Sequence, residues 1–134
     1  MIYLLDTNIV SYIITGRSQA ARARLEEVRS QACVSIITVG EILYGLEKVK
    51  AGKQRRKALE LFFDTVSVCL WGQDAAAAYG RLRAEQERLG KPLGPYDMQI
   101  AAHALALGAT LVSHDAAFRH ISGLAGLEDW AGDL

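Results

Sequence analysis

Four acidic residues fall at the junctions between short apolar runs and helical stretches, and they are Asp6, Glu41, Asp97 and Asp115. Carboxylates gathered in one cleft would repel each other and raise each other's pKa values. A divalent cation relieves that repulsion, and ligands that offer only oxygen suit Mg²⁺ or Mn²⁺. Such a centre can activate water for hydrolysis of a phosphodiester bond. The pattern therefore predicts a metal-dependent nuclease.

Each acid, taken alone, is better explained as a helix cap. Thr38 and Glu41 have the spacing of a capping box, in which the Glu carboxylate accepts from the Thr backbone N–H. Asp97 suits the positive end of a helix dipole, and Asp6 or Asp115 could accept from a first helical turn. Capping does not require an Asp directly after a buried strand together with acids at the other junctions. For the set as a whole, we therefore favour the metal site.

The acids need a framework that brings their junctions together. Strands are predicted at 2–5, 32–35, 66–70 and 110–112, with a short fifth strand within 124–130. Helices are predicted at 8–15, 18–29, from 38, and at 53–63, 74–89, 96–107 and 115–120. This alternation indicates an α/β fold, a three-layer α/β/α sandwich with a mainly parallel four- to five-stranded sheet. Ligands of such sheets bind beyond the carboxyl ends of the strands, where the acids are predicted.

Length and hydropathy fit a single domain over residues 1–134. The chain is 51% hydrophobic, but no apolar run approaches the roughly 20 residues needed to cross a bilayer. The first apolar run has no basic stretch before it and ends at Asp6, which predicts a buried strand and not a signal peptide. We expect a cytoplasmic protein without membrane association. Cys33 and Cys69 are expected to be free thiols in apolar surroundings.

The charge balance requires any nucleic-acid surface to be local. Fifteen basic and fifteen acidic residues give a formal net charge of zero, whereas proteins that bind nucleic acid through bulk charge are more basic. The best basic surface consists of Lys48, Lys50, Lys53, Arg55, Arg56 and Lys57. A solvated helical exterior explains this run slightly better than an RNA track.

Four sequence blocks resemble the PIN-domain family, and specifically the VapC-type toxins of bacterial toxin–antitoxin systems. The blocks are Tyr3–Asn8, Ser35–Gly45, Asp97–Ala104 and Gly108–Asp115. The strand–Asp-Thr-Asn start is a weak signal alone, but the four blocks in this order are specific and span nearly the whole chain. The resemblance implies a PIN-like fold and a Mg²⁺-dependent endoribonuclease that cuts tRNA or another structured RNA. It also implies a homodimer and a cognate antitoxin whose tail enters the acidic groove.

The resemblance also implies roles for individual residues. Asp6 and Asp97 would be the principal metal ligands, and Glu41 and Asp115 would complete the acidic set, directly or through water. Asn8 and Ser113 would orient the carboxylates by hydrogen bonding.

Two histidines stand apart from this set. His114 departs from the family pattern, because many members carry Asn at this position; the alternatives for it are an exposed loop residue and a substrate contact. His103 lies about 240° around its helix from Asp97, so we expect it at the surface or in a dimer contact.

Three other functions are compatible with the acids. A phosphatase would use Asp6 as its nucleophile, although Asn8 stands where such enzymes usually place a second Asp. A receiver-like module would accept a phosphoryl group on one Asp, and both of these alternatives predict a covalent aspartyl-phosphate. A PIN-like binding subunit without catalysis would cut no RNA, although the presence of all four acids disfavours it.

Overall fold

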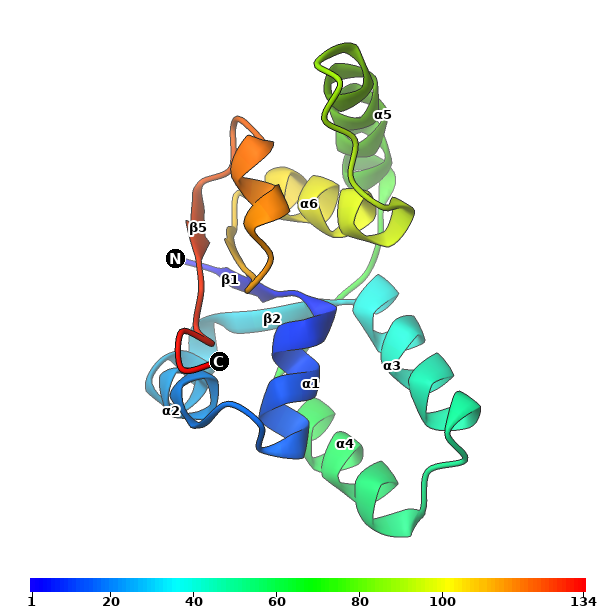
Figure 1. Ribbon diagram of the computed structural model, residues 1–134, viewed down its shortest axis with the longest axis vertical. Helices are drawn as coiled ribbons and strands as arrows, with labels where there is room; N and C mark the ends of the chain where they lie inside the picture. Colours follow the sequence, from blue (N-terminus) through cyan, green and yellow to red (C-terminus); the bar gives the residue numbers. More distant parts are fainter.

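A five-stranded sheet organises the computed structural model, which describes residues 1–134 (Figure 1). Its strands are β1 (Tyr3–Leu5), β2 (Ala32–Ser35), β3 (Ser67–Cys69), β4 (Thr110–Val112) and β5 (Gly126–Glu128). They are ordered β3-β2-β1-β4-β5 and every neighbouring pair is parallel. The predicted fold class is confirmed, with the short fifth strand at the edge of a sheet that is parallel throughout.

Six helices connect the strands, together with the 3₁₀ turns η1 (Arg29–Gln31) and η2 (Ala116–His120). The helices are α1 (Thr7–Thr15), α2 (Gln19–Val28), α3 (Ile36–Lys48), α4 (Lys53–Thr65), α5 (Gln73–Arg88) and α6 (Pro95–Leu107). None of them is long and apolar enough to span a bilayer.

The start of α3 differs from the prediction. The helix begins at Ile36 because Ser35, the last residue of β2, is its N-cap, and the Ser35 hydroxyl accepts from the Ile37 backbone N–H at 3.1 Å. The capping box expected between Thr38 and Glu41 was therefore wrong. Glu41 lies in the second turn of α3, where it is not needed to cap the helix.

Two hydrophobic clusters form the layers on either side of the sheet. Leu5 and Val34 pack with residues of α1, α2 and α4, whereas Leu4 and Leu111 pack with residues of α5 and α6. Adjacent residues of a strand point to opposite faces, so Leu4 and Leu5 enter different clusters. The helices accordingly cover both faces of the sheet (Figure 1).

The register of the strands places their carboxyl ends at one edge. Leu5 of β1 is level with Val34 of β2 and with Val112 of β4. The Asp6 backbone N–H continues this pairing by donating to the Val112 carbonyl at 3.0 Å. The residues that follow β1, β2 and β4 consequently meet, as predicted for the acidic site.

Candidate active site

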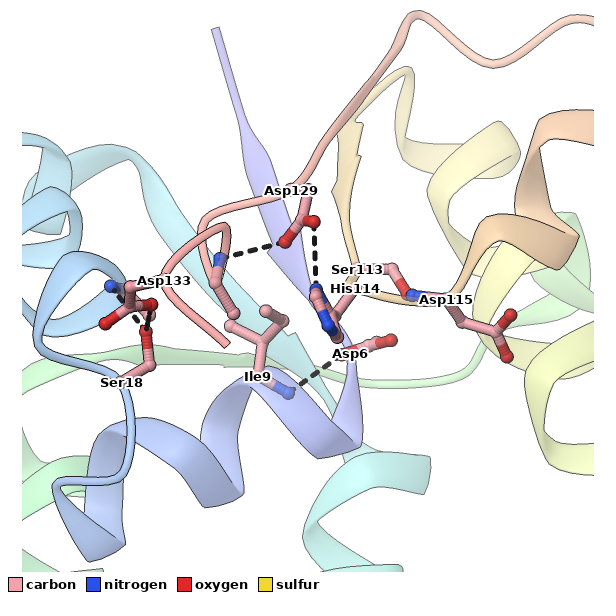
Figure 2. Close-up of polar contacts among 10 residues, drawn as sticks. Asp6, Ile9, Ser18, Ser113, His114, Asp115, Asp129 and Asp133 are labelled. Atoms are coloured by element: carbon pink, nitrogen blue, oxygen red, sulfur yellow. Dashed lines mark hydrogen bonds and ion pairs between the residues drawn. The ribbon is translucent and has the colours of Figure 1, made fainter.

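Asp6 lies between β1 and α1 and is only 5% exposed. One carboxylate oxygen accepts from the Ile9 backbone N–H at 2.9 Å and caps α1 (Figure 2). Burial, as the largest cause, and the negative charges of Asp97 and Asp115 together raise the pKa of Asp6 to about 6. Hydrogen bonds from Ser113 and Ile9 act in the opposite direction. Asp6 is thus both a helix cap and a buried carboxylate with two negatively charged neighbours.

Glu41 reaches the same place from α3. The Thr7 hydroxyl donates to its Oε1 atom at 3.0 Å and lies 3.2 Å from the Thr38 hydroxyl. Burial raises the pKa of Glu41, and the charge of Asp97 adds to the rise, whereas the Thr7 hydrogen bond lowers it. Sequence reasoning missed Thr7 and Thr38 as orienting residues. The only local signal for Thr7 was its position directly after Asp6.

Asp97 lies in the first turn of α6, as predicted, and accepts no hydrogen bond from the chain. Burial raises its pKa, with the charge of Asp115 as the second cause. Asp115 follows β4, accepts from the Ala117 backbone N–H at 2.9 Å and thereby caps η2. Asp115 thus serves as a cap, whereas Asp97 has no structural bond.

A cavity of about 270 Å³ joins three of the four acids. It is lined by Asp6, Thr7, Asn8, Glu41, Gly94, Pro95, Tyr96 and Asp97. Asp115 is not part of this lining, but its charge acts on both Asp6 and Asp97. No Lys, Arg or His forms an ion pair with any of the four carboxylates. The cavity therefore carries negative charge without a protein cation to balance it.

The side-chain oxygens at the cavity fit a hard divalent cation that keeps part of its water shell. The side chains are not grouped as a complete metal-binding cluster of three or more His, Cys, Asp or Glu residues, so the protein offers an incomplete ligand shell that water would complete. Mg²⁺ is commonly held by one or two carboxylates and keeps several of its waters. The unbalanced charge and the all-oxygen donors suit such an ion.

The two residues expected to orient the carboxylates differ in their contacts. Ser113 is 4% exposed, hydrogen-bonds to Asp6 and accepts from the Asp115 backbone N–H at 3.0 Å. Asn8 is exposed, lines the cavity and makes no side-chain hydrogen bond. Its expected role remains a prediction.

Neither His103 nor His114 forms a hydrogen bond or ion pair with any of the four acids. His114 Nδ1 is 2.9 Å from Asp129 Oδ2 (Figure 2). The His114 ring stands edge-on to the Tyr12 ring. His103 is only 2% exposed, so its predicted place at the surface was wrong.

The basic residues surround the turn between α3 and α4, where a cavity of about 620 Å³ is lined in part by Lys50 and Arg55. A second cavity, of about 310 Å³, lies between α1 and α3 and also includes Arg55. This second cavity shares Thr7, Asn8 and Glu41 with the acidic one. A groove along α1 thus joins the carboxylates to the basic turn.

Comparison with known proteins identifies relatives along almost the whole chain. A model of the PIN domain matches residues 3–124. The chain is 36% identical over 129 residues to the tRNA(fMet)-specific endonuclease VapC of Salmonella typhimurium, which covers 96% of this chain and 97% of that protein. It is 33% identical over 130 residues to the protein of the same name from Shigella flexneri, covering 96% and 98%. The crystal structure of VapBC2 from Rickettsia felis, bound to a DNA fragment from their promoter, superposes with a TM-score of 0.90 at 34% identity, covering 97% of this chain and 99% of the matched one.

Proposed function

The chain belongs to the PIN-domain family, as a VapC-type ribonuclease toxin of a type II toxin–antitoxin system, and on this premise we propose that its RNA-cleaving centre consists of Asp6, Glu41, Asp97 and Asp115. One observation carries the proposal. Three of these carboxylates have raised pKa values around one cavity and no basic partner.

Asp6 and Asp97 would hold Mg²⁺, or Mn²⁺ in its place, and Glu41 and Asp115 would act directly or through water. When bound, the ion supplies charge stabilisation at the phosphate and lowers the pKa of a water molecule. Asp6 is oriented for this role because its bond to Ile9 fixes the carboxylate at the start of α1. Asp97, which accepts no bond from the chain, has all its oxygen lone pairs available.

Other groups around the cavity would handle the proton and the phosphate. The Thr7 hydroxyl holds one oxygen of Glu41, which leaves the second oxygen free to take a proton from the attacking water. The start of α6 has no side-chain cap, so the backbone N–H groups of Tyr96 and Asp97 are free to donate to phosphate oxygens.

The substrate and partners follow from the relatives and the groove. We propose that the chain cuts tRNA or another structured RNA, because two relatives are named as tRNA(fMet)-specific endonucleases. The related VapBC2 structure supports a cognate antitoxin, whose segment would occupy the groove beside Glu41. A homodimer is part of the same proposal, and sedimentation of the purified chain tests it.

The decisive experiment replaces Asp97 with Asn. Purified wild type should cleave bulk bacterial tRNA in Mg²⁺, and the Asp97→Asn variant should not, while its circular dichroism spectrum stays unchanged. Asp64→Asn is the matched control, because Asp64 is exposed on α4, forms no side-chain hydrogen bond or ion pair, and undergoes the same change of charge. Full activity in Asp97→Asn would contradict the assignment. Absence of cleavage by wild type would instead favour the alternative of a PIN-like binding subunit without catalysis.

A further inference from the structure

A second polar cluster, separate from the carboxylates, lies inside the fold. It consists of His103 on α6 and Ser35 at the junction of β2 and α3, which are 2% and 0% exposed. His103 Nδ1 is 2.8 Å from Ser35 Oγ, although 68 residues separate them in the chain. The Trp71 ring covers the imidazole edge-on, with 5.5 Å between the ring centroids.

Ser35 and His103 each act both as a donor and as an acceptor of hydrogen bonds in this cluster. The imidazole faces the Ser35 hydroxyl at Nδ1, and the Leu70 backbone carbonyl acts on the ring as a hydrogen-bond acceptor that raises its pKa. A neutral ring with its proton on Nε2 satisfies both neighbours, because Nδ1 can then accept from the Ser35 hydroxyl. Burial lowers the pKa of His103, so the ring is neutral and Nδ1 is an acceptor. Ser35 therefore donates to His103, while its oxygen accepts from the Ile37 backbone N–H. No buried side-chain polar atom is left without a partner.

This chain of bonds joins the two helices that carry the half-buried acids. Glu41 lies six residues after Ser35 on α3, and Asp97 lies six residues before His103 on α6. Six residues of helix span about 9 Å. Each acid thus projects from a helix that is fixed at one point to the other helix, and the charge of Asp97 acts on Glu41.

We infer that His103, acting through Ser35, is a positioning residue that fixes the separation of Asp97 and Glu41 and so prepares the carboxylates for a divalent cation. The inference rests on the proposed function. Repulsion between the acids favours moving α3 and α6 apart before the ion binds, and the bond between His103 and Ser35 opposes that movement. Without the bond, part of the binding free energy would be consumed in closing the site.

Titration calorimetry with Mn²⁺ alone tests the inference. His103→Ala and Ser35→Ala should each weaken Mn²⁺ binding about tenfold, the effect typical of residues that orient metal ligands. The double variant should be no weaker than either single variant, because the two side chains act as a unit. His103→Asn, which keeps an acceptor for the Ser35 hydroxyl, should restore most of the affinity.

Ser18→Ala is the matched control. Ser18 is also a fully buried N-cap serine, on α2, where its hydroxyl accepts from the Ala21 N–H and donates to Asp133 at 2.6 Å. It should lower the thermal midpoint but leave Mn²⁺ affinity unchanged. Equal weakening by Ser18→Ala and Ser35→Ala, or wild-type affinity in His103→Ala, would overturn the inference.

Asp97→Asn in the same titration separates the two proposals. If Asp97→Asn loses Mn²⁺ binding while His103→Ala retains it, the positioning role fails and the proposed function stands. If Asp97→Asn binds Mn²⁺ like wild type, the metal assignment itself fails.

Discussion

Two aspartates at helix starts, Asp6 and Asp133, respond to their surroundings in opposite ways (Figure 2). Asp133 is exposed and accepts from the Ser18 hydroxyl and from the Ala20 backbone N–H, and these donors hold its pKa below the usual range. Asp6 also accepts a capping bond, but burial and two acidic neighbours raise its pKa to about 6.

The difference separates a structural carboxylate from a functional one. Donors and solvent stabilise the charge of Asp133, so its contacts are complete within the chain. The charge of Asp6 is stabilised only in part, so a proton or a cation must complete its environment. A capping bond alone therefore does not identify the role of an aspartate.

The largest expected effect on RNA cleavage comes from making the same Asp→Asn substitution at Asp6 and at Asp133. Asp6→Asn should reduce RNA cleavage by at least about a hundredfold, because a principal metal ligand loses its charge. Asp133→Asn should leave the cleavage rate unchanged. Both variants keep a capping oxygen, so neither should lose its helix. Initial rates on tRNA in Mg²⁺ measure the contrast, and equal rates for the two variants would remove it.

The second prediction concerns the pH dependence of stability in EDTA. Because the pKa of Asp6 rises from 3.8 to about 6 on folding, the native state keeps a proton that the unfolded chain has released between those values. The free energy of unfolding should therefore fall by about 2 kcal/mol as pH rises from about 4 to about 7. Glu41 and Asp97 add to this slope, since their pKa values are also raised.

Asp133 changes the free energy of unfolding with pH in the opposite direction and over a lower pH range. Its lowered pKa contributes stability that is present above about pH 4 and is lost as the pH falls through its folded-state pKa. Urea unfolding from pH 4 to 7 measures the Asp6 slope, which Asp6→Asn should reduce and added Mg²⁺ should flatten. A slope in Asp6→Asn as steep as that of wild type would show that Asp6 is not its source.

The smallest effect should come from removing the Thr7 hydroxyl, which donates a hydrogen bond to Glu41. The Ser18 hydroxyl donates to Asp133 in the same way. Thr7→Val should lower the cleavage rate about tenfold, since Glu41 loses the bond that orients it. Thr15→Val on the same helix is the control, because its hydroxyl bonds only to the Ser11 carbonyl. If the two variants cleave RNA at the same rate, the bond between Thr7 and Glu41 has no part in catalysis.

Much of the fold was predictable because it depends on local pattern. The apolar runs and the glycines after the helices set the positions of β1, β2, β4, α1 and α6 to within about two residues. The start of α3 was not predictable in this way, because a serine after an apolar run fits the end of a strand and a helix cap equally well. Ser35 is both.

The place of His103 shows why burial was harder to predict. Its angle from Asp97 around the helix follows from the residue spacing alone, but that angle does not say whether this side of α6 is covered. Five other residues of α6 are buried as well, Met98, Ile100, Ala101, Ala102 and Ala104, because the helix packs against both the sheet and α5. An apolar helix that is covered around most of its surface gives no periodic signal for an exposed side.

The sequence by itself determined the order of strands and helices and placed an acid at each relevant junction, because periodicity and strand ends are properties of neighbouring residues. Only the tertiary structure decided which hydroxyl donates to which carboxylate. It also decided that Glu41 does not cap α3, and that His103 is buried beside Ser35. Those contacts join residues 31 to 68 positions apart. Their energies depend on burial and on nearby charge, which exist only once the chain has folded.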